Sequence, residues 1–160
     1  MNDRVAVIDV GSNSVRLVVF DGAARSPAYF YNEKVLAGLG AGLGETGNLS
    51  PEGRRRALAA LHRFAALLER IKPAQLMTVA TAAVRDARDG AEFCAQVLRE
   101  TGLVLNIASG PEEGRLSAQG VLLGWPDAEG MVCDIGGASL EMAQLSGGDV
   151  SNAETAPIGP

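Results

Sequence analysis

The chain has 160 residues, 47% of them hydrophobic, and a formal net charge of −5. This length and apolar content predict one compact domain with a sizeable core. The negative charge argues against a nucleic-acid or acidic-membrane surface. With no apolar run of about 20 residues and no secretory signal pattern, we expect a cytoplasmic protein that neither binds nucleic acid nor crosses a membrane.

The first predicted element is a hairpin with a small polar turn. The apolar run Val5–Ile8 ends at Asp9, residues 11–14 (GSNS) have turn chemistry, and residues 15–20 (VRLVVF) resume as a strand. Small residues let backbone N–H groups approach a phosphate closely. The turn carries one carboxylate and several donors, which suits a metal-bridged phosphate, although an ordinary turn explains the same residues.

A third strand, a glycine-rich connection and a long helix are predicted next. The strand covers Ala28–Leu36, and Gly38–Gly47 is either a mobile loop facing a phosphate or a flexible connection. Ser50 and Pro51 mark a helix start, and we expect the following run Arg54–Arg56 to be solvated. The apolar stripe of this helix is Ala57, Leu61, Phe64, Leu68 and Ile71.

The next predicted strand, Leu76–Ala80, leads directly into residues 81–86 (TAAVRD), which include Arg85. Open α/β sheets place ligand groups just past the ends of their strands, although a surface ion pair explains this arginine equally well. A short helix over Ala91–Glu100 and a strand over Leu103–Ile107 follow.

A second long helix begins at Ser109, which has capping-box spacing to Glu112. Glu112 therefore has a structural explanation, whereas Glu113 does not. Glu113 is predicted to project from an inward stripe, so it either makes a structural ion pair or lines a cleft as a general base. The other members of that stripe are Leu116, Gly120 and Leu123.

The design of the first hairpin recurs near the end of the chain. An apolar strand from Met131 delivers Asp134 to the small turn Gly136–Ser139, and Leu140–Leu145 continues as a strand. Aligning the two aspartates aligns the glycines and serines of both turns. Two Asp-x-Gly-x-x-Ser hairpins in one chain favour phosphate binding much more strongly than one. Val150 onward is predicted to start a further strand.

Four ordered segments resemble the exopolyphosphatase and guanosine pentaphosphate phosphohydrolase (Ppx/GppA) family, within the superfamily of actin, sugar kinases and acetate kinase. They are DVGSNS at 9–14, ATAAVRD at 80–86, SGPEEGRL at 109–116 and DIGGASLE at 134–141. The resemblance covers essentially the whole chain. It implies an α/β ribonuclease-H-like (actin-like ATPase) domain, with a mixed five-stranded sheet that begins as an antiparallel meander, β-hairpin phosphate loops and helices on both faces.

The resemblance also implies roles for individual residues. Glu113 would be the general base that activates water, and Arg85 would neutralise phosphate charge in the transition state. Asp134 and Glu141 would hold a divalent metal, with Asp9 as a further ligand, and oxygen ligands favour Mg²⁺. The residues that would cradle phosphates are Gly11, Ser12, Asn13, Ser14, Gly136, Gly137 and Ser139.

The implied reaction is metal-assisted attack of water that releases terminal orthophosphate from inorganic polyphosphate or a guanosine penta- or tetraphosphate such as ppGpp. A non-catalytic polyphosphate or nucleotide sensor and a kinase of the same superfamily are the alternatives. The glutamates in EEGRL argue against the kinase. The sequence departs from the family pattern at three positions: Ala138 replaces glycine, Leu140 replaces threonine and Gly114 replaces alanine. The first two replacements put the affinity of the second turn for phosphate in doubt.

Residues 1–160 are expected to form a single ribonuclease-H-like domain, the first of two in the full-length family. The segment Pro157-Ile158-Gly159 is similar to the point where the second domain of the family begins. The expected partners are therefore the polyphosphorylated substrate, the missing second domain in cis and, in the full-length form, a second copy of the protein.

Overall fold

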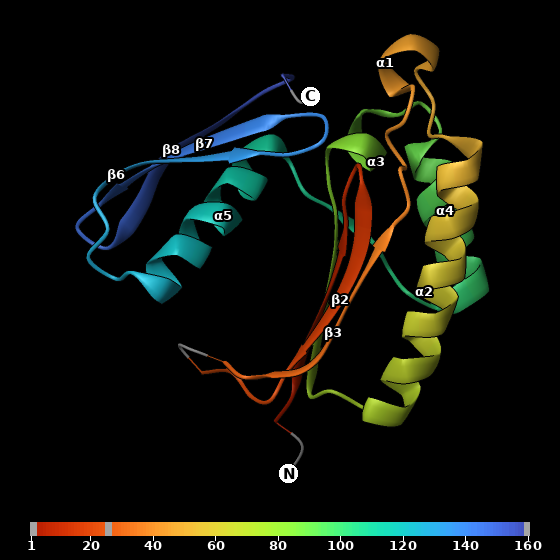
Figure 1. Ribbon diagram of the computed structural model, residues 1–160, viewed down its shortest axis with the longest axis horizontal. Coiled ribbons are helices and arrows are strands. Elements are labelled where there is room, and N and C mark those ends of the chain that lie inside the picture. The colour runs from red at the N-terminus through yellow and green to blue at the C-terminus, as the bar shows by residue number, and fades with distance from the viewer. Residues whose placement is uncertain (1–2, 25–26, 159–160) are drawn as a thin grey trace. The chain divides into compact units, whose positions relative to one another are not determined.

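A computed structural model of the protein describes residues 3–24 and 27–158. The chain divides into two compact units, Met1–Ile107 and Ala108–Pro160, each with its own β-sheet (Figure 1). The expected single domain over residues 1–160 stays a prediction, and Gly159, which belongs to the expected start of a second domain, lies outside the described residues.

The first unit contains the mixed five-stranded sheet that the sequence predicts, in the order β3-β2-β1-β4-β5. Strand β1 pairs antiparallel with β2 on one edge and parallel with β4 on the other. The first three strands form the predicted antiparallel meander. The strands are β1 (Val5–Val10), β2 (Ser14–Phe20), β3 (Tyr29–Leu36), β4 (Gln75–Ala80) and β5 (Asn106–Ile107).

Alternation along β1 places Ala6, Ile8 and Val10 on one face of the sheet, where all three are fully buried. The helices α2 (Pro51–Ile71) and α4 (Gly90–Thr101) lie side by side over this face (Figure 1). The predicted stripe of α2 is confirmed in its buried members, which are Ala57, Leu61, Phe64 and Leu68.

The N-terminus of α2 forms as the sequence predicts. The side chain of Ser50 accepts a hydrogen bond from the Gly53 N–H at 3.1 Å, and Pro51 occupies the first turn. The helix ends at Lys72, whose φ of 49° is left-handed, immediately before Pro73, which lacks the N–H needed to continue a helix. Arg54 is not simply solvated, because its guanidinium donates to Asp89 at 2.9 Å.

Strand β5 is shorter than the predicted Leu103–Ile107. Side-chain hydrogen bonds replace most of the ladder to β4: Thr78 Oγ1 donates to the Val104 carbonyl, and Asn106 Nδ2 donates to the Thr78 carbonyl at 3.1 Å. Only two residue pairs join the strands in register. The segment therefore runs beside β4 without becoming a regular strand.

The glycine-rich connection after β3 also differs from a simple flexible linker. It contains the short helix α1 (Leu43–Thr46), flanked by Gly42 and Gly47 with φ of 74° and 69°. These left-handed positions suit glycine. Leu39 in the same stretch is fully buried in the core of the first unit.

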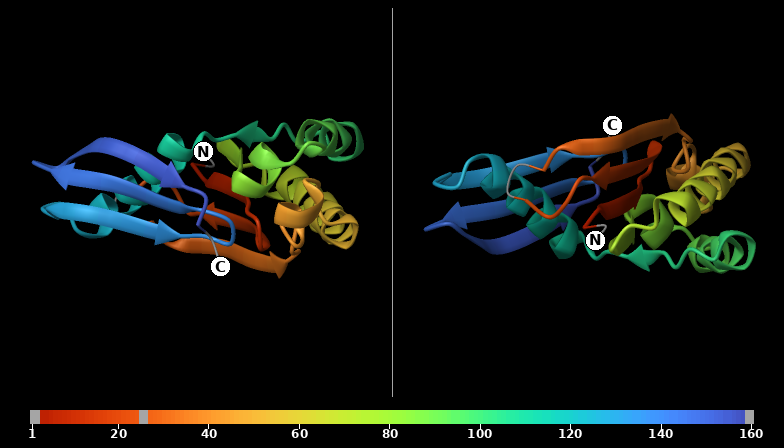
Figure 2. Two further views of the ribbon diagram at one scale, coloured as in Figure 1. Left: turned by 90° about the horizontal axis from the view of Figure 1, so that it is seen from above. Right: turned by 90° about the horizontal axis from the view of Figure 1, so that it is seen from below.

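The second unit is one helix packed on an antiparallel sheet in the order β6-β7-β8. Figure 2 shows the helix behind the three strands in one view and in front of them in the other, so it covers one face. Ala118, Ala143 and Leu145 are buried between helix and sheet. The elements are α5 (Gly110–Gly124), β6 (Gly130–Ile135), β7 (Leu140–Ser146) and β8 (Asp149–Ala156).

The contact of β3 with α2 should make the stability of the first unit depend on pH. Arg63 Nε donates to Glu33 Oε1 at 3.0 Å, and the Tyr31 hydroxyl donates to Glu33 Oε2 at 2.5 Å. The pKa of Glu33 is lowered from its ordinary value of 4.5, mainly because of the hydrogen bond from Arg63. A lowered carboxyl pKa stabilises the fold above pH 4.5, and this stabilisation is lost as the pH falls through the lowered value.

We therefore expect Glu33→Gln to lower the melting temperature at pH 7, and we expect a smaller difference at a pH well below 4.5, as the pH falls through the lowered pKa of Glu33. Thermal melts of both proteins followed by circular dichroism across this range provide the measurement. An equal difference at both pH values would contradict the ion-pair explanation.

Candidate functional site

The first hairpin ends in a tight turn closed by one backbone hydrogen bond. The Gly11 N–H donates to the Ser14 carbonyl at 2.9 Å, just beyond the paired residues Val10 and Val15. Ser12 is buried and Asn13 is exposed. Of the two central residues of the turn at the end of β1, only Asn13 is therefore exposed.

The second hairpin has the same turn. The Gly136 N–H donates to the Ser139 carbonyl at 2.9 Å, just beyond the pair Ile135 and Leu140. The repeat read from the sequence is therefore also a repeat in backbone structure. In both hairpins the aspartate lies one residue before the last pair of the ladder.

The two hairpins differ in the charge that faces each aspartate across the ladder. Asp9 lies opposite Arg16, whose Nε donates to Asn32 at 2.9 Å. Asp134 lies opposite Glu141. Opposed residues on neighbouring strands have their side chains on the same face. The second hairpin therefore brings two carboxylates together, a like-charge pair that a cation would stabilise.

Hydroxyl groups hold both carboxylates of this pair. Thr155 Oγ1 donates to Glu141 Oε1 at 3.0 Å, and the Glu141 side chain is buried, with 5% exposed. Ser117 Oγ donates to Asp134 Oδ2 at 2.5 Å, and this hydrogen bond connects α5 to β6. A metal site of two carboxylates would thus be oriented by a strand on one side and a helix on the other.

Glu113 lies on α5 one turn before Ser117, so both side chains lie on the same flank of the helix. The predicted inward stripe is wrong, because Leu116 and Leu123 are 44% and 51% exposed. Small residues form the buried face instead, and they let the helix lie close to the sheet: Gly110, Gly114 and Ala118. Glu113 is half-buried beside this face.

The capping box predicted at the start of α5 is present. The Ser109 N–H and hydroxyl both donate to Glu112 Oε2, at 2.8 and 2.7 Å, and the Glu112 N–H donates back to the hydroxyl. The hydrogen bonds that Glu112 accepts lower the pKa of its carboxyl group, and the bond from the Ser109 hydroxyl contributes most. Glu112 therefore has the structural role expected of it, and a catalytic role for its neighbour Glu113 stays a prediction.

Arg85 lies on the short helix α3 (Ala82–Asp86), directly after β4. The Thr81 N–H donates to the Val10 carbonyl at 3.1 Å, so this helix starts beside the end of β1. Arg85 Nε donates to Asp86 Oδ1 at 3.0 Å, and 21% of the arginine side chain is exposed. The structure therefore brings helix α3, which carries Arg85, and the first turn together at the carboxyl ends of the neighbouring strands β4 and β1.

The predicted site residues divide between the two units. Asp9, the first turn (Gly11–Ser14) and Arg85 belong to the first unit. Glu113, Asp134, Glu141 and the second turn belong to the second unit, where helix α5 and the sheet bring the three carboxylate-bearing residues to adjoining elements. The residues of the second turn are Gly136, Gly137, Ala138 and Ser139.

The two departures from the family pattern in the second turn now have a structural setting. Ala138 is absent from the residues with positive φ, so the described backbone does not require glycine there. Leu140 neighbours Glu141 on β7, and successive side chains of a strand point to opposite faces. Leu140 therefore lies on the face away from the carboxylate pair.

Among the described residues (3–24 and 27–158), no three His, Cys, Asp or Glu side chains form a ready-made metal site. The chemistry of the Asp134–Glu141 pair nevertheless fits a hard cation, since both groups are anionic oxygen donors held by hydroxyls. Mg²⁺ commonly takes one or two protein carboxylates and completes its coordination with water and substrate phosphates.

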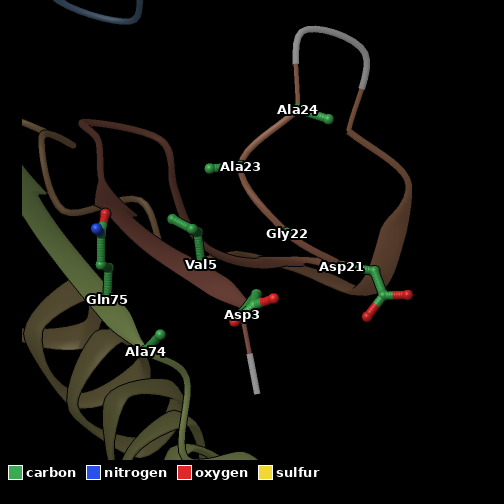
Figure 3. Close-up of a pocket in the computed structure, with 8 residues that line it drawn as sticks. All are labelled: Asp3, Val5, Asp21, Gly22, Ala23, Ala24, Ala74 and Gln75. Carbon is green, nitrogen blue, oxygen red and sulfur yellow. The ribbon is translucent and has the colours of Figure 1, made fainter. Parts of the chain in front are cut away.

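A pocket of about 530 Å³ lies at the other end of β1, away from the Gly11 turn. The starts of β1 and β4 line one side, and the turn Asp21–Ala24 lines the other (Figure 3). Asp3 and Asp21 give this pocket negative charge, which would repel a polyanion. It is therefore no candidate for the phosphate site.

Residues 18–160 match the model of the Ppx/GppA phosphatase family. The chain belongs to this family. It is similar to the Ppx/GppA phosphatase of Aquifex aeolicus, with 33% identity and a TM-score of 0.82 over 98% of this chain and 52% of that one. It is also similar to an exopolyphosphatase from Cytophaga hutchinsonii, with 28% identity and a TM-score of 0.89 over 98% of this chain and 51% of that one.

More distant structures share the fold alone. MreB5 of Spiroplasma citri, solved with ADP, is 17% identical with a TM-score of 0.50 over 98% of this chain and 52% of that one. The actin-like ATPase fold expected of this Ppx/GppA chain is confirmed. The chain spans about half the length of the relatives it matches. No helix in the described ranges has the length and apolar character needed to span a membrane.

Ser117 and Thr155 are site residues that the sequence analysis did not identify. The sequence could have indicated Ser117, because it follows Glu113 by one helical turn and so lies on the same side of the helix. It could not have indicated Thr155, because the place of Thr155 opposite Glu141 depends on the register of β8. That register shifts at an irregularity between Met142 and Gln144, which counting residues along the sequence does not reveal.

The close packing at the start of α5 predicts that Gly110→Ala destabilises the second unit. A Cβ on Gly110 would lie 2.0 Å from Thr155 Cγ2 and 2.5 Å from its Cβ, so the helix or the strand must move. We expect a loss of about 1–3 kcal/mol. Urea unfolding followed by fluorescence of Trp125, which ends α5, measures it.

Gly120→Ala is the matched control on the same helix, because nothing lies within 4 Å of the added methyl. It should leave stability unchanged or raise it by up to about 1 kcal/mol. Equal losses in the two variants would show that the packing against Thr155 is not what requires glycine.

Proposed function

We propose that the full-length protein containing this chain is a phosphoanhydride hydrolase that releases terminal orthophosphate from inorganic polyphosphate or a guanosine penta- or tetraphosphate. Membership of the Ppx/GppA phosphatase family and similarity to an exopolyphosphatase support a phosphatase acting on polyphosphate. Because the chain spans about half of these relatives, the activity is proposed for the full-length protein.

The observation that carries the proposal is the opposed pair of carboxylates at the second hairpin. Asp134 and Glu141 face each other beside a turn of small residues, and Glu113 lies on the helix that packs on the same sheet. The first hairpin repeats the turn without the acidic pair, because Arg16 takes the place of the glutamate. This difference supports a cation at the second hairpin, and the contribution of Asp9 remains a further prediction.

The proposed role of Glu113 is to accept a proton from the attacking water. As the new P–O bond forms, the terminal phosphoanhydride bond breaks and the shortened chain leaves with its electron pair. Arg85 would neutralise charge on the phosphoryl oxygens. The backbone donors of each turn would contact phosphate oxygens of the substrate. A kinase would instead need to position an acceptor other than water.

Asp134 and Glu141 would hold Mg²⁺ through their carboxylate oxygens. When bound, the ion would offset the negative charge of the substrate phosphates and of the departing group. Ser117 and Thr155 would keep the two carboxylates oriented while the ion and the substrate exchange. Both hydroxyls already donate to these groups, so their contribution can be tested by substitution.

Glu113→Gln in the full-length protein should lower kcat about 100- to 10,000-fold. The amide keeps the shape of the side chain but cannot accept the proton, so KM should change little. The measurement is orthophosphate release with Mg²⁺ from long-chain polyphosphate and from guanosine pentaphosphate in parallel, and the better substrate identifies the natural class.

Glu154→Gln is the control, because Glu154 is exposed on β8 and neighbours Thr155, so it lies on the face away from the carboxylate pair. It should retain near wild-type rates. Full activity in Glu113→Gln would disprove the general-base assignment. A wild-type protein that binds either polyanion without releasing phosphate would be a sensor and not a hydrolase.

Ser117→Ala should weaken Mg²⁺ binding by about tenfold or more, because Asp134 loses the hydroxyl that orients it. Isothermal titration with Mg²⁺ in the absence of substrate measures this directly. Ser151→Ala, at an exposed position on β8, is the control. Unchanged Mg²⁺ affinity in Ser117→Ala would show that the Ser117 hydroxyl does not orient a metal ligand.

A further inference from the structure

The connection between β3 and α2 makes two hydrogen bonds to the first turn. We call residues 38–49 the glycine segment. The Gly38 N–H donates to the Asn13 carbonyl at 2.9 Å, and the Gly40 N–H donates to the Ser12 carbonyl at 2.8 Å. The carbonyls of Ser12 and Asn13, the two central residues of the turn, therefore both accept hydrogen bonds from this segment.

These bonds determine where the turn aims its donors. The described chain contains no cis peptide bond, and in a trans peptide the carbonyl of one residue and the N–H of the next point in opposite directions. Holding the Ser12 carbonyl toward Gly40 therefore directs the Asn13 N–H away from the glycine segment. An anion at the turn would meet this N–H already oriented.

Close packing fixes the glycine segment itself. A Cβ on Gly40 would lie 3.1 Å from the Ser12 Cβ and 3.5 Å from the Ala83 Cβ, so Gly40 fits between the turn and helix α3. A Cβ on Gly53, in the first turn of α2, would lie 2.5 Å from the Gly38 carbonyl oxygen. The Ser50 N–H also donates to the Leu39 carbonyl at 2.9 Å.

The other end of the glycine segment is attached to the chain just after α3. The Arg88 N–H donates to the Gly47 carbonyl at 3.0 Å. The Leu49 N–H donates to Asp89 Oδ1 at 2.8 Å, and Arg54 donates to Asp89 Oδ2 at 2.9 Å. The side chains of Arg54 and Asp89 are 19% and 18% exposed, so this pair is largely shielded.

We propose that the glycine segment positions the first turn and the Arg85 helix as one phosphate-binding frame, with Gly40 and Asp89 as positioning residues. The inference rests on the proposed function, since it assigns phosphate contacts to the turn and Arg85. It adds that neither element binds phosphate effectively unless the glycine segment holds both. Substitutions in this segment, outside the phosphate contacts themselves, should then alter substrate binding.

The test compares Gly40→Ala with Gly44→Ala in the full-length protein. The methyl at position 40 would press on Ser12 and Ala83, whereas nothing lies within 4 Å of a methyl at position 44. Gly40→Ala should raise KM for polyphosphate about tenfold, as expected for one misplaced hydrogen bond to a charged group. Its kcat and melting temperature should stay close to those of Gly44→Ala.

Amide hydrogen exchange gives a readout that does not require activity. In Gly40→Ala the amides of Gly11 and Gly38, which close the turn and bind it to the glycine segment, should exchange about tenfold faster than in wild type. In Gly44→Ala their exchange should be unchanged. If the wild type releases no phosphate, the proposed function fails, while the exchange comparison still decides whether the segment holds the turn.

Asp89→Ala tests the other attachment, with Glu92→Ala as its control. Both variants remove a partner of Arg54, but only Asp89 also accepts from the Leu49 N–H. Asp89→Ala should therefore raise KM and Glu92→Ala should not. The inference is overturned if KM and exchange in Gly40→Ala match those of Gly44→Ala. It is also overturned if activity falls only in proportion to stability, with KM unchanged.

Discussion

One backbone hydrogen bond, from a glycine N–H to the carbonyl of the serine three residues later, occurs in both hairpins at 2.9 Å. It closes each turn directly beyond the last strand pair, so the aspartate before it always lies at the same place on the ladder. The other polar groups of the candidate site lie on the paired strands beside these turns, or on the helices α3 and α5.

The two hairpins share a backbone but differ in electrostatics. Arg16 opposite Asp9 compensates the charge of the first pair, while Glu141 opposite Asp134 doubles the charge of the second. A like-charge pair is costly unless a cation offsets it, and Ser117 and Thr155 orient these two groups without neutralising them. Under the proposed function, both turns would contact phosphate through their backbone, and only the second would also lie beside a bound cation.

Sequence reasoning predicted most of the fold because the local signals agreed with the tertiary structure. The strand β1, the serine and proline at the start of α2 and the capping box of α5 all form as predicted. It failed for the buried face of α5, where glycine and alanine replace the large apolar residues on which the 3.6-residue pattern depends. Sequence reasoning also did not predict that the glycine segment is held in place, since a glycine-rich composition does not reveal hydrogen bonds made to a distant turn.

The sequence by itself determined most of the strands, the long helices, the repeated Asp-x-Gly-x-x-Ser turn and the capping role of Glu112, because each depends on residues within a few positions of one another. Only the tertiary structure decided that Glu141 faces Asp134 and Thr155, and that Gly40 lies between Ser12 and Ala83. Strand register and close backbone contact join residues that are far apart in the chain, and no local pattern encodes those distances.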